Sequence, residues 1–394
     1  MDIYTRYLVR QHLWRIFVVA VLIVAIVTPI HVGSHVDDTW EAAVAHGRSG
    51  ARDLLLFVGL RATDVVSQTF SFAFFLGLLW SEASLSLSGR RLMTQIAGRS
   101  IAAGVPALLA VAALSVPVQF LLQNYARPHA VLTLVDERIG TYRQYVSNEN
   151  GPHGNWVSAG DRILQARAID RYAGEFREVT LYAFAADNRL QEVLVAARIA
   201  PDAASGRWRA EDGYSATIPE ALHPGASGSG AVPFGARILD LGIDPLWMRY
   251  NGIQPIYIPM ADLIRLARSA GIPADQPDYA AGLQVRLAKS FIPALLSVLA
   301  AGTFLLGTRR RTVVRAAAIS LGAAYLGVAA SDAAGAFGQS QHFAGGVGAW
   351  LSPLLLLVLC AFILWRLHRV AGPVPAAQPV GTPLGPEAEP RIAP

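Results

Sequence analysis

Long apolar runs separated by short polar segments occupy both ends of the 394-residue chain. A helix needs about 20 apolar residues to cross the hydrocarbon core of a bilayer, so runs of about 18 or more are candidate transmembrane helices. No small-residue cleavage site follows the first run, which we therefore interpret as an uncleaved anchor rather than a signal peptide. The pattern predicts six transmembrane helices, near residues 13–32, 65–87, 101–122, 290–308, 315–337 and 347–366.

The pattern changes between the third and fourth runs, where short strand-like stretches alternate with Gly, Asp and Asn. Residues 176–199 read as two strands around a turn at Asp187–Asn188, and the segments on either side are similar. Such strands and turns are typical of an antiparallel sandwich or jelly roll. Residues 260–271 then predict a helix near the end of this region. The expected fold class is an α-helical membrane protein with six transmembrane helices and an inserted antiparallel β-jellyroll domain.

Four segments follow from this reading. Residues 1–123 hold the first three helices, 124–285 the β domain, 286–370 the last three helices, and 371–394 a Pro-rich tail that we expect to be disordered. The only cysteine, Cys360, lies in the sixth run. The β domain therefore has no disulfide and must be held together by the packing of its sheet.

Arginines are placed unevenly among the connecting segments, and short loops rich in Arg and Lys stay in the cytoplasm. They precede the first run and follow the second, fourth and sixth runs, whereas the loop at residues 339–348 has no Arg or Lys. We therefore expect a multi-pass protein of the bacterial inner membrane with both termini in the cytoplasm and residues 124–285 in the periplasm. The arginines concerned lie at Arg6, Arg10, Arg15, Arg90, Arg91, Arg99, 309–315, Arg366 and Arg369.

Composition and motifs exclude several classes of function. The chain is 53% hydrophobic and only 15% charged, which is unlike a soluble globular protein. Its net charge of +5 arises from arginines that are placed by topology, so nucleic-acid binding has no separate support. The sequence lacks P-loop, HExxH and GxSxG motifs and has a single lysine, Lys289, so we expect no enzymatic activity and no cofactor.

Two weaker patterns favour no binding site. His31 and His35 lie four residues apart near Asp37 and Asp38. A metal site needs three or four converging ligands, so we interpret these residues as a polar rim at the membrane surface and expect no metal. The glycine-rich segment 224–235 has neither a following helix start nor a basic anchor, which favours a flexible loop over a phosphate cradle.

The order of three apolar runs, one inserted β domain and three further runs resembles the LptF/LptG (YjgP/YjgQ) permease family, the membrane half of the lipopolysaccharide exporter. Local segments resemble that family as well: RYLVRQHLWRIF at 6–17, LLQNYARPHAVLTL at 121–134, YAAGLQVRLAKSFIPALLSVLA at 279–300 and GAWLSPLLLLVL at 348–359. The resemblance implies a permease subunit of an ABC-type exporter that extracts lipopolysaccharide or a related glycolipid from the inner membrane. It also implies three protein partners: an LptB-type ATPase dimer that hydrolyses ATP, a paralogous LptF/LptG subunit, and an LptC-type periplasmic bridge protein that receives the lipid.

The same resemblance assigns a role to the basic segment 88–100, because in this family the connection between the second and third spans is a coupling helix that docks in a groove of the ATPase. Leu92, Met93 and Ile96 lie at helical spacing, as a helix-in-groove contact requires. The family usually has Glu where this chain has Arg90, which predicts a matched ATPase or a diverged role. Without the resemblance, a solvated loop whose arginines fix the topology would be favoured. The expected coupling residues are Arg90, Arg91, Leu92, Met93, Ile96 and Gly98.

Basic residues near the outer ends of the spans are candidates for contact with a lipid headgroup. Arg286 and Lys289 open the fourth span, although snorkelling to the bilayer interface explains their positions nearly as well. In the family, basic residues near the outer end of the first span meet lipid A phosphates. Here acids and arginines are mixed over residues 31–53, which favours a less anionic glycolipid. The lipid-cavity candidates are Arg52, Arg61, Arg286 and Lys289.

Two acids, Glu82 and Asp332, lie inside apolar runs. Intramembrane acids are usually functional, and these two would be the proton carriers of an ATP-independent lipid or solute transporter. Alternatively, Glu82 reaches the interface beside Trp80, and Asp332 lines a helix contact. A membrane-anchored periplasmic adaptor or sensor, which would need no coupling helix, is a third candidate function.

Overall fold

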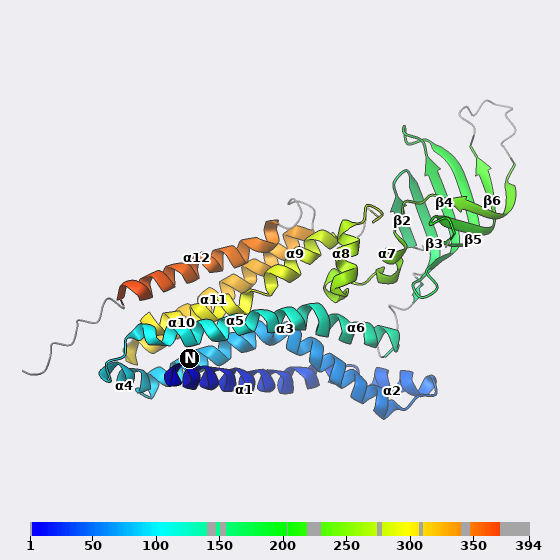
Figure 1. Cartoon of the computed structure of the whole chain (residues 1–394). Coiled ribbons are helices and arrows are strands. Elements are labelled where there is room, and N and C mark those ends of the chain that lie inside the picture. Colours follow the sequence, from blue (N-terminus) through cyan, green and yellow to red (C-terminus); the bar gives the residue numbers. More distant parts are fainter. Residues whose placement is uncertain are drawn as a thin grey trace, which may run out of the picture.

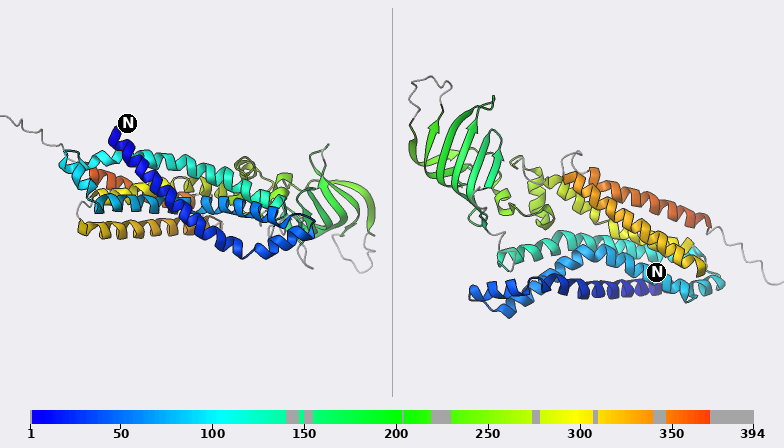
Figure 2. Two further views of the ribbon diagram at one scale, coloured as in Figure 1. Left: turned by 90° about the horizontal axis from the view of Figure 1, so that it is seen from below. Right: turned by 180° about the vertical axis from the view of Figure 1, so that it is seen from behind.

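A computed structural model of the chain describes residues 2–139, 147–149, 155–202, 204–218, 230–273, 278–306, 310–339 and 347–370. Long helices run side by side as a bundle, with a β domain at one end and the short helix α4 (Arg90–Ile96) at the other (Figure 1). Two further views show the same separation (Figure 2). We call these two ends of the bundle the sheet end and the α4 end.

The helices of the bundle are those that the apolar runs predict. Among the described residues, five helical segments are long and apolar enough to cross a membrane: Ile3–Gly33, Gly50–Leu87, Ala102–Asp136, Tyr279–Leu306 and Gly348–Arg369. The remaining predicted span, 315–337, lies within α11 (Arg310–Gln339), whose described apolar part, Val313–Ala329, is shorter. The expected class, a helical membrane protein with an inserted antiparallel β domain, is confirmed.

The second span begins earlier than the apolar run suggests. Helix α3 (Gly50–Leu87) has 38 residues, which corresponds to about 57 Å at 1.5 Å per residue and exceeds the thickness of a bilayer core. It follows α1 (Ile3–Gly33) and the short helix α2 (Val36–Ala45). Helices α1 and α3 approach each other closely, because a Cβ atom at Gly77 would overlap the backbone of Ile16. The segment before residue 65, which the apolar run does not include, is part of the same continuous helix.

The third span continues past the expected start of the β domain. The short helix η1 (Ile101–Gly104) leads into α5 (Val105–Leu121), a π-helical turn η2 (Leu122–Ala126) and α6 (Arg127–Asp136). Pro128 has no N–H group to donate to the preceding turn, which accounts for the widened turn just before it. The expected boundary between residues 123 and 124 therefore falls inside a continuous helical segment.

The β domain contains one antiparallel sheet. Strands β3 to β7 follow one another in the sheet in sequence order, each antiparallel to its neighbour. Strands β1 and β2 both pair with the other edge of β3, at different parts of its length. Asn188 has a φ of 62° in the turn between β4 and β5, as the sequence predicts for the Asp187–Asn188 turn. The strands are β1 (Ser147–Glu149), β2 (Asn155–Ala159), β3 (Arg162–Asp170), β4 (Glu175–Phe184), β5 (Leu190–Pro201), β6 (Trp208–Thr217) and β7 (Val232–Leu239).

Helical segments that follow β7 lie between the sheet and the bundle (Figure 1) and share one hydrophobic core with the sheet. These segments are α7 (Pro245–Tyr250), the 3-10 turn η4 (Pro255–Tyr257) and α8 (Met260–Arg268), and α8 is the helix predicted at 260–271. Alternate strand residues such as Leu164, Val179 and Leu194 pack against side chains that include Trp247 and Leu263. Burial of these apolar groups stabilises the domain without a disulfide.

The chain returns to the bundle through α9 (Tyr279–Lys289), which leads into α10 (Ile292–Leu306). Helix α10 is the most deeply buried of the described helices in the bundle. It packs against α3, α5 and α12 (Val347–Val370), and α12 ends at the α4 end of the bundle (Figure 1). The expected tail, residues 371–394, lies outside the described residues.

Candidate functional site

Helix α4 presents an apolar face that the described part of the chain leaves uncovered. Gly89, with a φ of 72°, turns the chain from α3 into α4, and Gly98, with a φ of 80°, follows its end. Both conformations favour glycine because a side chain would be strained there. The side chains of Leu92, Met93 and Ile96 are 56%, 70% and 73% exposed. The structure thus brings the three expected apolar residues together on one accessible surface.

The other side of α4 is fixed to the bundle through a buried carboxylate. Arg91 donates from Nε to Oε2 of Glu82 at 3.1 Å, and a terminal nitrogen of its guanidinium contacts the same oxygen. Glu82 belongs to α3 and is 1% exposed. On its other oxygen, Nε2 of His12 lies 3.4 Å away, and Nδ1 of that ring lies 2.7 Å from the hydroxyl of Ser81. Glu82 therefore connects α1, α3 and α4.

Two further arginines hold α4 and the segment after it along the start of α1. Arg90 donates to the hydroxyl of Tyr7 at 2.8 Å. Arg99 pairs with Asp2 at 2.5 Å and lies over the ring of Tyr4, 5.0 Å from its centre. The hydrogen bond from Arg99 lowers the pKa of Asp2, although both groups are at the surface. These exposed contacts are individually weak compared with the buried pair of Arg91 and Glu82.

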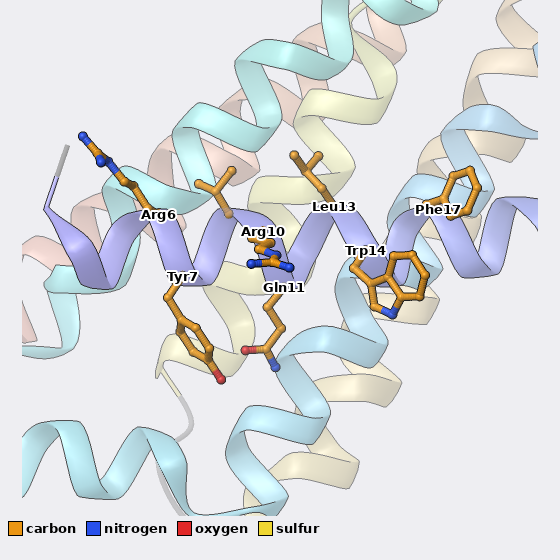
Figure 3. A pocket seen from close by; sticks show the side chains of 8 residues that line it. Arg6, Tyr7, Arg10, Gln11, Leu13, Trp14 and Phe17 are labelled. Atoms are coloured by element: carbon orange, nitrogen blue, oxygen red, sulfur yellow. The ribbon is translucent and has the colours of Figure 1, made fainter.

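A cavity of about 950 Å³ lies beside the first turns of α1 (Figure 3). Arginines line one part of it and aromatic rings another, so its wall is both basic and apolar. Among the described residues, those that line it all belong to α1. The lining residues are Arg6, Tyr7, Val9, Arg10, Gln11, Leu13, Trp14 and Phe17.

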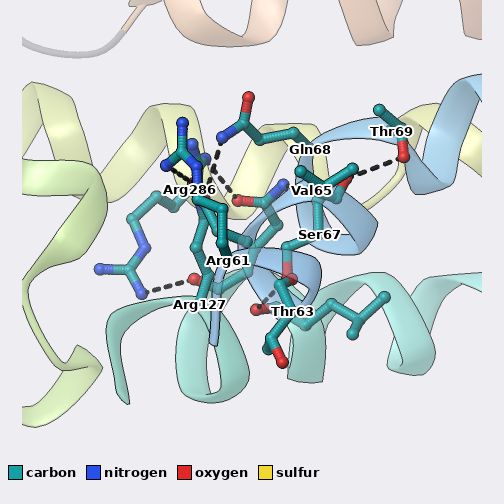
Figure 4. Close-up of polar contacts among 11 residues, drawn as sticks. Arg61, Thr63, Val65, Ser67, Gln68, Thr69, Arg127 and Arg286 are labelled. Carbon is teal, nitrogen blue, oxygen red and sulfur yellow. Dashed lines mark hydrogen bonds and ion pairs between the residues drawn. The ribbon is translucent and has the colours of Figure 1, made fainter. Parts of the chain in front are cut away.

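A second buried polar network lies toward the sheet end (Figure 4). Its centre is Asp64 of α3, whose side chain is fully buried. Asp64 accepts hydrogen bonds from Arg61 at 2.7 Å, from Nε of Arg127 at 2.7 Å and from the amide of Gln68 at 2.9 Å. Arg127 also lies 3.4 Å from Oε1 of Gln123. The network therefore joins α3 to η2 and α6.

Arg286 of α9 lies in the same region but contacts only carbonyl groups among the hydrogen bonds described for it. It is 2% exposed and donates to the carbonyl oxygens of Pro255 at 3.3 Å, Ile258 at 2.5 Å and Gln123 at 3.0 Å. Its Nε atom is buried without a hydrogen-bond partner. In this conformation the guanidinium connects η4 to η2 and is not available to a lipid headgroup.

The four lipid-cavity candidates are therefore not gathered in one place. Arg61 and Arg286 belong to the buried network, whereas Arg52 is exposed near the start of α3 and Lys289 is half-buried at the end of α9. Sequence reasoning missed Arg127 as a partner of Asp64. The sequence shows only that both charges border apolar runs, since Asp64 precedes the run 65–87 and Arg127 follows the run 101–122, and it does not show that they pair.

The remaining candidates add no site. Asp332 lies in α11, but its side chain is outside the described part of the structure. Within the described residues, no three His, Cys, Asp or Glu side chains are placed to hold a metal ion. Half of the glycine-rich segment 224–235, residues 224–229, lies outside the described residues, and its last residues enter β7.

Comparison with known families finds one that matches most of the chain. The sequence profile described as lipopolysaccharide export system permease LptF/LptG matches residues 6–366, from the first turns of α1 to the last turns of α12. No curated protein sequence matches the chain. A match over both helical halves and the β domain, together with the apolar helices, identifies a multi-pass protein of the inner membrane. The chain belongs to the lipopolysaccharide export system permease LptF/LptG family.

Proposed function

We propose that this chain is a permease subunit of an ABC-type exporter and that α4 is the helix that a separate, LptB-type ATPase dimer engages. The observation that carries the proposal is the division of α4 into two faces. Leu92, Met93 and Ile96 are exposed, whereas Arg91 is turned inward onto Glu82. A short helix with an exposed apolar face and a fixed rear face suits a helix-in-groove contact.

The α4 end is the cytoplasmic end in this proposal. Support comes from the basic residues of segments far apart in the sequence, which gather there: the starts of α1 and α11, the end of α12, and α4 itself (Figure 1). Short basic segments stay in the cytoplasm. Both termini are then cytoplasmic and the β domain is periplasmic, where an LptC-type bridge protein would receive the lipid.

The proposed substrate is lipopolysaccharide or a related glycolipid, held between this chain and a paralogous LptF/LptG subunit. Arg52, which is exposed at the start of α3, and Lys289 are the remaining candidates for its headgroup. Helix α2 lies at the sheet end of the bundle, and Asp37 and Asp38 are exposed in its first turn. Such a mixed field suits a headgroup that is less anionic than a heavily phosphorylated one.

We favour this function over an ATP-independent transporter because the carboxylate of Glu82 is paired with basic side chains. A proton carrier must release its proton along the transport path, whereas both carboxylate oxygens of Glu82 face basic groups, Arg91 and His12. An adaptor or sensor would not require an apolar face on α4.

The test is Met93→Asp in the full-length chain, co-expressed with its ATPase and purified in detergent. Docking would bury an unpaired carboxylate, at a cost of several kcal/mol, so we expect the ATPase to be lost from the purified complex. Val314→Asp is the matched control, because Val314 is 77% exposed near the basic start of α11. Retention of the ATPase by Met93→Asp would refute the proposal, and its loss from Val314→Asp alone would move the docking surface to residues 309–315.

A further inference from the structure

Helix α3 carries three buried carboxylates. Asp53, in its first turn, pairs with Arg48 of the loop just before the helix. The other two, Asp64 and Glu82, pair with arginines of other helices. Asp64 and Glu82 are 18 residues apart, which at 3.6 residues per turn is about five turns. Their side chains therefore leave α3 in nearly the same direction, about 27 Å apart along its axis. Both side chains are at most 1% exposed. Burial of an ionised carboxylate is unfavourable unless a basic group pairs with it, so the partners of these two acids define where α3 is held.

Each carboxylate is bound by an arginine from a different segment. At the α4 end, Arg91 of α4 binds Glu82. At the sheet end, Arg127 of α6 binds Asp64 at 2.7 Å. Arg61, which belongs to α3 itself, also binds Asp64. Apolar contacts between helices tolerate sliding, whereas a buried ion pair fixes one register, because any shift leaves a charge without a partner. Helix α3 is thus fixed to its neighbours at two depths.

The contact at the sheet end continues into the β domain. The guanidinium of Arg127 lies over the ring of Tyr257 in η4, 5.0 Å from the ring centre. The other side of η4 rests on α9, where a Cβ atom at Gly282 would lie 2.6 Å from Cβ of Pro255. Arg286 of α9 donates to the carbonyl groups of Pro255 and Ile258. Ile258 is fully buried in the core of the β domain. Movement of α6 relative to α9 would therefore move η4 and the core of the β domain behind it.

We propose that α3 is a rigid strut that couples α4 to the β domain, with Glu82 and Asp64 as its two attachment points and Arg91 and Arg127 as positioning residues. The proposal rests on the proposed role of α4. A push on α4 is passed to α3 through Glu82, along the helix to Asp64, and through Arg127 to Tyr257 of η4. Coupling of this kind needs a continuous physical connection between the two sites, and the buried ion pairs supply its two joints.

The test uses the complete exporter in proteoliposomes that contain lipopolysaccharide, with ATP hydrolysis and lipid release measured on the same sample. Asp64→Asn keeps the shape of the side chain and removes its charge. We expect the ATPase to remain bound and to hydrolyse ATP, while lipid released per ATP falls about tenfold, within the range of ordinary coupling energies. Thr69→Val is the matched control, because the hydroxyl of Thr69 donates only within α3, to the carbonyl oxygen of Val65.

A second pair of variants separates coupling from simple stabilisation. Asp64→Asn combined with Arg127→Gln removes the two most buried charges and leaves Arg61, whose side chain is 20% exposed, so much of the thermal stability lost in the single variant should return. A merely structural role predicts that lipid release returns with the stability, whereas a strut predicts that release stays low. If Asp64→Asn alone does not fold, the double variant carries the test. Glu82→Gln also weakens the pair that holds α4, so it is assayed at a saturating concentration of ATPase. Under that condition it should lower the lipid released per ATP as Asp64→Asn does, and combining the two should lower it no further, because they interrupt one path.

The possible results separate this inference from the proposed function. If the ATPase does not co-purify with the natural chain, or if Met93→Asp retains it, the role of α4 is wrong and the strut has nothing to couple. If the ATPase binds normally and Asp64→Asn releases lipid at the usual ratio to ATP, only the strut is refuted. Independent, multiplicative effects of Glu82→Gln and Asp64→Asn would refute it as well.

Discussion

Replacing Arg91 with Met tests whether one buried ion pair holds α4 in place. Met keeps much of the apolar stem of Arg91 but leaves the carboxylate of Glu82 without its main partner. No residue of α4 is buried, so packing contributes little to holding this helix against the bundle. We therefore expect α4 to detach while the long helices keep their arrangement.

The magnitude follows from the surroundings of Glu82. Removing one partner of a buried pair costs about 3–5 kcal/mol. Two features of the site reduce this cost. The side chain of Arg91 is 13% exposed, and His12 remains 3.4 Å from Glu82 as a second basic group. We expect about 2 kcal/mol, which corresponds to about thirtyfold in the equilibrium between docked and detached α4 at 1.4 kcal/mol per factor of ten. The affinity of the ATPase should fall by up to the same factor, because it must first select the docked helix.

Two measurements on the detergent-solubilised chain check this expectation. Amide hydrogen exchange over residues 88–100 should become faster in Arg91→Met, and titration with the purified ATPase should give a higher Kd. Arg90→Met is the control for hydrogen exchange. Arg90 is exposed and its partner, the hydroxyl of Tyr7, is uncharged, so the effect of this substitution on the position of α4 should stay below about 1 kcal/mol. Equal exchange rates and equal affinity in Arg91→Met and the natural chain would refute the role of the ion pair.

Two further predictions concern other contacts. Gly77→Ala should lower the melting temperature in detergent by the equivalent of about 1–3 kcal/mol, because the new Cβ atom would push α1 away from α3 at Ile16. Gly59→Ala is the control and should leave the melting temperature unchanged, since a Cβ atom there meets no other atom within 4 Å. Burial and the hydrogen bond to Asp136 of α6 raise the pKa of Tyr172 to about 12. This hydrogen bond needs the protonated hydroxyl, so it should be fully present below about pH 10 and lost as the pH rises through 12. Absorbance titration should therefore show one tyrosine fewer ionising near pH 12 in Tyr172→Phe, and identical curves would contradict the assignment.

The local pattern of the sequence was sufficient for the elements whose cause is local. Apolar runs depend only on length and hydropathy, and the turn at Asn188 depends on the tolerance of that residue for a positive φ. The apolar spacing of Leu92, Met93 and Ile96 likewise predicted a common face, which the structure contains. Each of these features is decided within a few residues of the chain.

Features that depend on distant partners could not be predicted in this way. Arg61 and Asp64 make the start of α3 look too polar for a continuous span, and Arg127 appears to end the third span. These charges compensate one another in the fold, because Asp64 pairs with an arginine 63 residues away. Nothing in the hydropathy of either segment reveals that pairing. Both helices are consequently longer than their apolar runs, and the residues expected to face lipid lie partly inside the protein.

The two arginines at the start of α4 differ in a way that bears on the choice of ATPase. The sequence predicted a reversal of charge at Arg90 and placed Arg91 among the coupling residues beside it. Arg91, however, is neutralised by Glu82 of the same chain, so the docking surface carries the charge of Arg90 alone at this point. Since Arg90 is exposed and tied only to Tyr7, it can turn toward a carboxylate on the ATPase at little cost. A matched ATPase therefore needs to differ from the usual family partner at one position that faces Arg90, and not across its whole groove.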